Sequence, residues 1–258
     1  MSGAGFFAVG RDTFIKACDL GMNPACALLV LASGTGRDNS TTKWSAEAVK
    51  KYAGVRWQTA SDAINAIVSS QLVSKGGTAT RPTYKLKKDG ELIWIPRALV
   101  EGAIGEVSPV ARIRQTQDHM TLRLLIELYS SQNLREDGGI STKVIMEKYD
   151  RRKAGQQGAY TIWDFTGGRS WLTWCEITQP HRKVKLTQEE KNDSVNTTVD
   201  FFRRLSTLEG LGLLQWVPYL FDGEEGEPIH ALASNGLEEE QSLYASAVDA
   251  AMRMLTEV

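Results

Sequence analysis

Residues whose types and spacing could contact nucleic-acid bases occur together in the segment 56–65. An amide side chain can bond the edge of adenine through a donor and an acceptor at once, and a guanidinium can bond guanine in the same way. The segment holds amides and a guanidinium together. The outward-facing side chains able to touch a partner are Trp57, Gln58, Ser61, Asp62 and Asn65, and Arg56 precedes them. The alternative interpretation is a solvated helix face without a partner.

The elements that must position these side chains are two helices and a tight turn. The second helix is predicted by apolar residues recurring about every 3.6 positions, which is typical of one buried face. These residues are Ala60, Ala63, Ile64, Ile67, Val68 and Leu72. Ser45 is a plausible cap for a shorter helix before it. The two helices meet at Ala53-Gly54-Val55, which predicts a helix-turn-helix.

Further elements are predicted on either side of this pair. An almost wholly apolar helix covers residues 25–32, and a short strand follows at 41–44. After Val73, residues 83–86 alternate as a strand does, and Asp89-Gly90 is a hairpin signal leading into a strand at 92–95. The predicted order is helix, strand, helix, helix and then a β-ribbon.

The run Gly54-Val55-Arg56-Trp57-Gln58-Thr59-Ala60-Ser61, continued by Leu72-Val73, resembles the pattern G-V-S-x-x-T-V-S … G-L-I of bacterial winged helix-turn-helix regulators. The resemblance covers residues 23–95. Arg56 stands where Ser is usual, and Gln71 stands where Gly usually ends the helix. The resemblance implies a winged-helix fold whose third helix enters the major groove of DNA. It also implies the base-facing candidates, which are Arg56, Trp57, Gln58, Ser61 and Asn65.

Basic residues near this module are expected to contact phosphates, which positions a protein on DNA without specifying a sequence. Residues 1–100 contain 13 Lys and Arg against 7 Asp and Glu, whereas the remaining 158 residues contain 17 against 24. The net charge of −1 argues against an indiscriminate coat for nucleic acid. The phosphate-contact candidates are Lys43, Lys50, Lys51, Lys75, Arg81 and Lys85.

A second copy of the module is predicted after residue 109. Leu124-Leu125-Ile126 echoes residues 28–30, residues 141–149 echo residues 45–52, and the third helix would run from Asn192 or Ser194 to Leu208. Its ending, residues 208–214, fits the family pattern better than the first copy does. A strand is expected at 215–220. The DNA-contact candidates of this copy are Lys143, Lys148, Arg151, Arg152, Lys153, Asn196, Thr197 and Arg203.

The second copy carries an insertion at about 155–192, in which strands at 159–165 and 170–177 would form a hairpin around residues 166–169. Three tryptophans on it are candidates for binding a protein partner, although aromatic residues on paired strands often pack on their own core. They are Trp163, Trp171 and Trp174. A final helix at 237–255 would dock on its own domain or pair two subunits as a homodimer.

No enzymatic chemistry, metal site or cofactor is expected. The Gly-rich segments are neither a phosphate-binding loop nor a dinucleotide fingerprint. His119, His181 and His230 are scattered, and three cysteines do not have a metal-binding spacing. Few cysteines and the absence of a secretory leader or membrane-spanning run predict a cytoplasmic protein.

These patterns together predict an α+β protein of tandem winged helix-turn-helix domains, mostly helical with small β-wings. The expected domains are residues 1–95 and 110–258, joined by a linker at 96–109 that contains about one helical turn. The expected function is sequence-dependent binding of double-stranded DNA, in transcription regulation or in plasmid or phage replication initiation. The alternative is a non-enzymatic protein-interaction scaffold that uses the Trp-rich insertion and the acidic second half of the chain.

Overall fold

The computed structural model describes residues 5–78, 80–102, 106–132, 139–140, 149–157, 160–167, 201–215, 220–221 and 228–229. The chain divides into two compact units: unit 1 has residues 1–131 and 176–214, and unit 2 has residues 132–175 and 215–258. Helices and small antiparallel sheets occur together, so the fold is α+β, as predicted. None of the helices in these ranges is long and apolar enough to cross a membrane.

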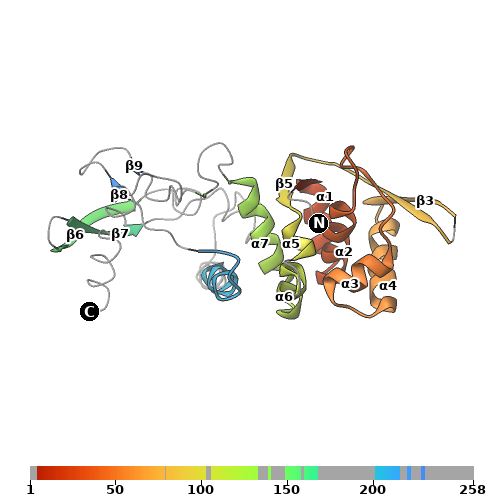
Figure 1. Cartoon of the computed structure of the whole chain (residues 1–258). Helices are drawn as coiled ribbons and strands as arrows, with labels where there is room; N and C mark the ends of the chain where they lie inside the picture. The colour runs from red at the N-terminus through yellow and green to blue at the C-terminus, as the bar shows by residue number, and fades with distance from the viewer. Residues whose placement is uncertain are drawn as a thin grey trace, which may run out of the picture. The chain divides into compact units, whose positions relative to one another are not determined.

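One apolar helix, α2 (Met22–Ser33), forms the centre of unit 1 (Figure 1). Every residue from 24 to 33 is buried, because its sequence is apolar on all sides. Three amphipathic helices pack on α2 and supply the other half of the core. They are α1 (Arg11–Asp19), α3 (Ala46–Ala53) and α4 (Trp57–Ser69).

A three-stranded antiparallel sheet lies beside these helices, in the order β2 (Thr41–Thr42), β4 (Pro82–Leu86) and β3 (Val73–Gly77). Strands β3 and β4 form a hairpin whose turn is closed by reciprocal backbone hydrogen bonds between Thr78 and Arg81. The predicted ribbon, in which residues 83–86 pair with residues 92–95, is therefore wrong. Residues 83–86 pair with the strand before them.

The strand at 92–95 belongs to a different sheet. It is β5 (Leu92–Pro96), and it pairs with an N-terminal strand, β1 (Phe6–Gly10), that no sequence pattern predicted. The Asp89-Gly90 turn connects the two sheets instead of closing a hairpin. Gly90 has φ 81°, and the Asp89 backbone N–H donates to the Thr13 hydroxyl at 3.1 Å. This turn is therefore held against α1.

Three helices after β5 also belong to unit 1: α5 (Ala98–Glu101), α6 (Pro109–Gln115) and α7 (His119–Ser130). Helix α5 is the single turn predicted within residues 96–109. Helix α7 contacts α1 and β5, and Arg11 donates from Nε and Nη2 to Glu127 Oε2 at 2.9 and 2.8 Å. Residues 109–130 thus belong to unit 1, whereas the sequence analysis assigned them to a second domain.

The helical segment 201–210 returns to the same unit. Phe201, Leu205 and Leu208 are buried at helical spacing, and Arg112 Nη1 donates to the Leu211 carbonyl at 2.8 Å. The third helix predicted for the second copy is therefore present from residue 201 onward. Its predicted beginning, at 192 or 194, lies outside the described residues.

Unit 2 contains two described strand pairs. Strand β6 (Tyr149–Gln157) pairs with β7 (Tyr160–Gly167), and β8 (Leu220–Phe221) pairs with β9 (Pro228–Ile229). Tyr149, predicted to end a helix, begins a strand. Strand β7 covers most of the strand predicted at 159–165 and pairs with the residues before it, a pairing that was not predicted; the predicted partner, residues 170–177, lies outside the described residues.

The sequence of β6, YDRRKAGQQ, lacks the apolar alternation that would have identified it as a strand. The predicted helices at 141–148 and 237–255 lie outside the described residues, as do residues 170–177. Of the strand predicted at 215–220, residue 220 is the first residue of β8.

Candidate nucleic-acid interface

Helix α4 exposes the base-facing candidates because its other side packs against the core. Ala60, Ala63, Ile64 and Ile67 are buried, as their spacing predicted. The opposite side therefore faces solvent. Trp57 is 49% exposed, Arg56, Gln58 and Asn65 are exposed, and Ser61 is half-buried. The structure brings all five candidates together at the beginning and middle of one helix.

The turn before α4 adopts the left-handed backbone conformation that a glycine accommodates without strain. Gly54 has φ 64° and ψ 38°, and it ends α3 as predicted. Its backbone N–H donates to the Lys50 carbonyl at 3.1 Å. The direction in which α4 leaves α3 is set at this residue.

Helix α6 holds this turn from outside the helix pair. Arg114 Nε donates to the Ala53 carbonyl at 2.7 Å, and its Nη2 donates to the Gly54 carbonyl at 3.2 Å. The Ser108 hydroxyl, which caps α6, also donates to the Tyr52 carbonyl. The carbonyls at the end of a helix have no partner within the helix. Donors from α6 satisfy three carbonyls here, which fixes α3 and α4 to the rest of unit 1.

The β3–β4 hairpin projects from the body of unit 1 beside α4 (Figure 1). Lys75, Arg81 and Lys85 on it are all exposed. The register places Lys85 opposite Ser74 and Lys75 opposite Tyr84, so the two lysines emerge from opposite faces of the hairpin. The predicted phosphate contacts therefore surround the hairpin and do not lie on one side of it.

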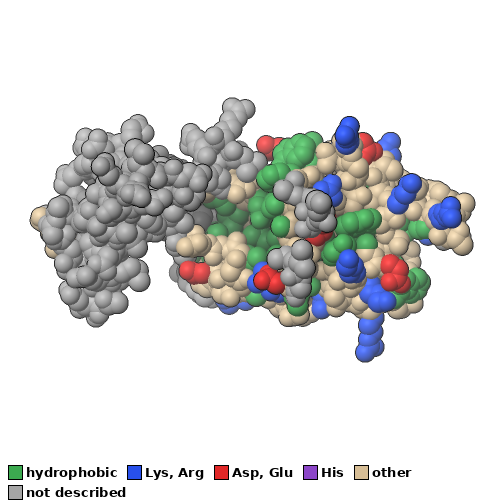
Figure 2. Space-filling view, in the orientation of Figure 1, with side chains coloured by type: hydrophobic (Ala, Val, Ile, Leu, Met, Phe, Trp, Pro, Cys, Tyr) green, Lys and Arg blue, Asp and Glu red, His purple; other side chains and the backbone are tan. Residues whose placement is uncertain are grey.

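The remaining phosphate-contact candidates lie on or just before α3, and all are exposed. Lys50 Nζ lies 3.4 Å from Glu47 Oε2, and Lys51 Nζ lies 4.7 Å from the centre of the Tyr52 ring. Tyr52 itself stacks on Trp44, with ring centroids 5.0 Å apart. Figure 2 shows Lys and Arg side chains over the part of the surface formed by the hairpin and the helices next to it.

Asp62 is the acidic residue on the outward side of α4, where the sequence placed it, but its contact with Gln58 was not predicted. Gln58 Nε2 donates to Asp62 Oδ1 at 2.9 Å, and both side chains are exposed. Their spacing of four residues on one helix is the signal that could have revealed this pair. One base-facing candidate thus already has a hydrogen-bond partner on the protein.

The candidates of the predicted second copy are not brought together in the same way. Lys143, Lys148, Asn196, Thr197, Trp171 and Trp174 lie outside the described residues. Arg151, Arg152 and Lys153 are in β6, and Trp163 is in β7. Arg203 lies in the helical segment 201–210, and its Nη2 lies 3.6 Å from Asp118 Oδ2.

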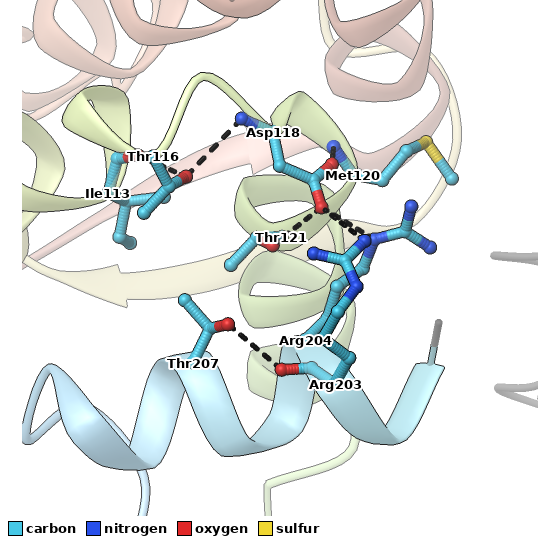
Figure 3. A network of polar contacts seen from close by, with 8 residues as sticks. All are labelled: Ile113, Thr116, Asp118, Met120, Thr121, Arg203, Arg204 and Thr207. Carbon is cyan, nitrogen blue, oxygen red and sulfur yellow. Dashed lines mark hydrogen bonds and ion pairs between the residues drawn. The ribbon is translucent and has the colours of Figure 1, made fainter. Parts of the chain in front are cut away.

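Asp118 is the centre of a polar network between α7 and the helical segment 201–210 (Figure 3). Arg204 Nε donates to Asp118 Oδ2 at 2.8 Å, and the Met120 N–H and Thr121 hydroxyl also donate to its carboxylate. Burial raises the pKa of Asp118, but these donors and the charge of Arg204 outweigh it and hold the pKa below its ordinary value. The network therefore joins two elements of unit 1 through an ionised carboxylate.

The cysteines and acidic residues of the described ranges show no metal-binding arrangement: no three His, Cys, Asp or Glu side chains there are grouped so that they could hold an ion. Cys18 and Cys26 are free thiols in the core. Burial raises the pKa of both, that of Cys26 to about 12. Both are therefore protonated at neutral pH and are poor nucleophiles or ligands.

Comparisons with protein-family models, with curated proteins and with solved structures found no match for this chain. Its function must therefore be inferred from the residues and geometry described above.

Proposed function

We propose that the protein binds double-stranded DNA in a sequence-dependent manner, with α4 in the major groove and the β3–β4 hairpin along the backbone. The observation that supports this best is the outward side of α4, where amides and a guanidinium lie beside a projecting basic hairpin. Side chains of these types can read base edges, and lysines on the hairpin can neutralise phosphates. Transcription regulation and replication initiation both depend on such binding.

The arrangement of elements supports a winged-helix interpretation of the first module. Helix α2, strand β2, helices α3 and α4, and the β3–β4 hairpin follow one another along the chain, with the sheet order β2-β4-β3. We infer a second counterpart, of which the structure describes α7 and the helical segment 201–210 at the sequence positions predicted for its first and third helices. The first module carries the DNA-binding proposal.

The charges on the first module favour a polyanionic partner. Among the ion pairs between described residues, none involves Lys43, Lys75 or Lys85. These three exposed cations are therefore free to replace the counterions that surround DNA phosphates. Release of those counterions makes affinity fall steeply with salt concentration.

The test is fluorescence anisotropy of a labelled random-sequence duplex, titrated with the whole protein at several salt concentrations. Lys85→Glu should weaken binding and reduce the slope of log affinity against log salt by about one for each phosphate that is no longer neutralised. Lys16→Glu is the control for charge, because it makes the same change on α1, outside the hairpin. Since Lys16 Nζ lies 3.7 Å from Asp89 Oδ2, circular dichroism first checks that this variant is folded. The control should leave the slope close to that of the unchanged protein.

Two outcomes would contradict the proposal. One is a lack of binding at low salt, and the other is equal weakening by Lys85→Glu and Lys16→Glu, which would indicate nonspecific attraction to total charge. Selection of bound duplexes from a random pool then tests sequence dependence. A palindromic motif among the selected duplexes would support a homodimer, since operator symmetry mirrors protein symmetry.

A further inference from the structure

The hydrogen bond between Gln58 and Asp62 lies on the surface that α4 would present to DNA. Both residues are exposed, and they are four positions apart on the helix. Asp62 carries a negative charge on this surface, which lowers affinity for any phosphate backbone nearby. A surface that served affinity alone would gain nothing from this carboxylate, so its contribution has to be sought in selectivity.

The hydrogen bond leaves Gln58 with a specific set of free groups. A glutamine amide has two N–H donors on Nε2 and an acceptor oxygen, Oε1. One N–H is donated to Asp62 Oδ1 at 2.9 Å. The other N–H and Oε1 remain, and they match the N7 acceptor and the N6 amino donor of adenine in the major groove. The terminal torsion of a free glutamine is broad, so a partner that fixes it pre-organises the amide.

We propose that Asp62 is a positioning residue that fixes the Gln58 amide for bidentate recognition of adenine. This inference rests on the proposed DNA binding. Asp62 itself does not contact the adenine: it orients Gln58, and its charge weakens binding to every duplex alike. Removal of the orienting bond therefore relaxes the choice of base at one position and leaves the other positions of the site unchanged.

The experiment begins with selection of duplexes from a random pool by the whole protein and by Gln58→Ala. The position whose preference Gln58→Ala abolishes is the one that Gln58 reads, and we expect it to be an adenine. Affinities are then measured for duplexes that carry adenine, guanine or 7-deazaadenine at that position. Each replacement breaks one bond of the bidentate pair, because 7-deazaadenine lacks the N7 acceptor and guanine has an O6 acceptor in place of the N6 donor; each should weaken binding of the unchanged protein about tenfold.

Two substitutions of Asp62 separate positioning from charge. Asp62→Asn keeps an acceptor for Gln58 Nε2 but removes the charge, so binding to every duplex should strengthen while the tenfold preference for adenine is retained. Asp62→Ala also removes the charge but leaves Gln58 without its partner, so the preference should fall to about twofold. In a Gln58→Ala background, Asp62→Ala should not change the preference further, because the two residues act as one unit.

The outcomes distinguish this inference from the proposed function. If the unchanged protein binds no duplex, both fail. If it selects a motif that Gln58→Ala leaves intact, or if the position read by Gln58 is not adenine, DNA binding stands and the inference is overturned. Equal preference for adenine in Asp62→Ala and Asp62→Asn would also overturn it, because Asp62 would then act by charge alone.

Discussion

Helix α4 and the helical segment 201–210 end with the same pair of backbone hydrogen bonds. After α4, Leu72 N–H donates to Ile67 and Gln71 N–H to Val68, at 3.0 and 2.9 Å. After the second segment, Leu213 N–H donates to Leu208 and Gly212 N–H to Glu209, at 2.9 and 2.8 Å. This is the Schellman ending, in which one residue adopts a left-handed conformation. That residue is Gln71, with φ 57°, in one helix and Gly212, with φ 65°, in the other.

The two helices differ in how their polar sides are used. The Arg56 guanidinium and the Asn65 amide of α4 extend into solvent, whereas Arg203 and Arg204 of the second segment turn toward Asp118 of the same unit. A guanidinium that pairs with a carboxylate of its own protein attracts a phosphate less strongly, because the carboxylate neutralises part of its charge. Equivalent helix endings therefore do not imply equivalent functions, and the comparison favours α4 over the segment 201–210 for the DNA binding that we propose.

The largest expected effect is the loss of stability when the segment 201–210 loses a buried side chain. It tests whether this segment is part of the core of unit 1. Phe201 is fully buried and its neighbour Phe202 is 39% exposed, so the two residues form a matched pair. Phe201→Ala should lower the free energy of unfolding by about 3–5 kcal/mol. Phe202→Ala should lower it by about 1 kcal/mol, because its ring buries less apolar area. Chemical denaturation followed by circular dichroism measures both, and equal effects would contradict the assignment of this segment to the core.

A smaller effect is expected at the carboxylate that joins the segment to α7. Asp118→Asn removes a charged acceptor of several hydrogen bonds, so the free energy of unfolding at pH 7 should fall by about 1–3 kcal/mol. Because the pKa of Asp118 is lowered in the folded protein, its contribution is complete above the ordinary Asp pKa of about 3.9 and is lost as pH falls through the lowered value. Denaturation at several pH values should therefore show the variant and the unchanged protein converging in acid.

Asp19→Asn on the exposed end of α1 is the control for this measurement. It should leave the stability at pH 7 nearly unchanged. If Asp118→Asn had no larger effect than this control, the network in Figure 3 would not hold the segment to α7. The contrast between α4 and the segment 201–210 would then have no electrostatic basis.

The smallest effect concerns the two helix endings themselves. Gln71→Gly should raise the free energy of unfolding by about 1 kcal/mol, because a left-handed conformation is strained in a residue with a Cβ but not in glycine. The reverse change, Gly212→Gln, should lower it by a similar amount. No atom lies within 4 Å of a Cβ placed at Gly212, so backbone strain alone is tested there. Thermal denaturation should show that the two substitutions change the free energy of unfolding in opposite directions. A change in the same direction would contradict the equivalence of the two helix endings.

Local patterns in the sequence predicted the elements of the candidate interface well. The buried stripe of α4 and the left-handed Gly54 each depend on residues a few positions apart, which periodicity and turn chemistry report directly. The outward-facing residues then followed from the position of the stripe, and the family resemblance implied that they face bases. The partner of Gln58 was missed, although Asp62 lies only one helical turn away.

Strand pairing was predicted poorly because it depends on distant residues. Strand β1 was missed, since its partner β5 lies more than eighty residues later in the chain. Asp89-Gly90 does form a turn, as its sequence predicted, but the turn connects two sheets. Its contacts with Thr13 and the start of α1 hold it there, and no local pattern reports them. The hydrogen bonds from Arg114 to the carbonyls of residues 53 and 54 could not be predicted either, because no local pattern links the two segments.

The division of unit 1 into two stretches of sequence affects the order in which it can fold during synthesis. Residues 1–131 leave the ribosome first, and residues 132–175 of unit 2 follow before residues 176–214 complete unit 1. Until then, the carboxylate of Asp118 lacks Arg203 and Arg204, and the core lacks Phe201 and Leu208. Domains generally fold as units once all of their chain is available. We therefore expect the unit that carries the α4 surface to reach its final stability only after residue 214 has been synthesised.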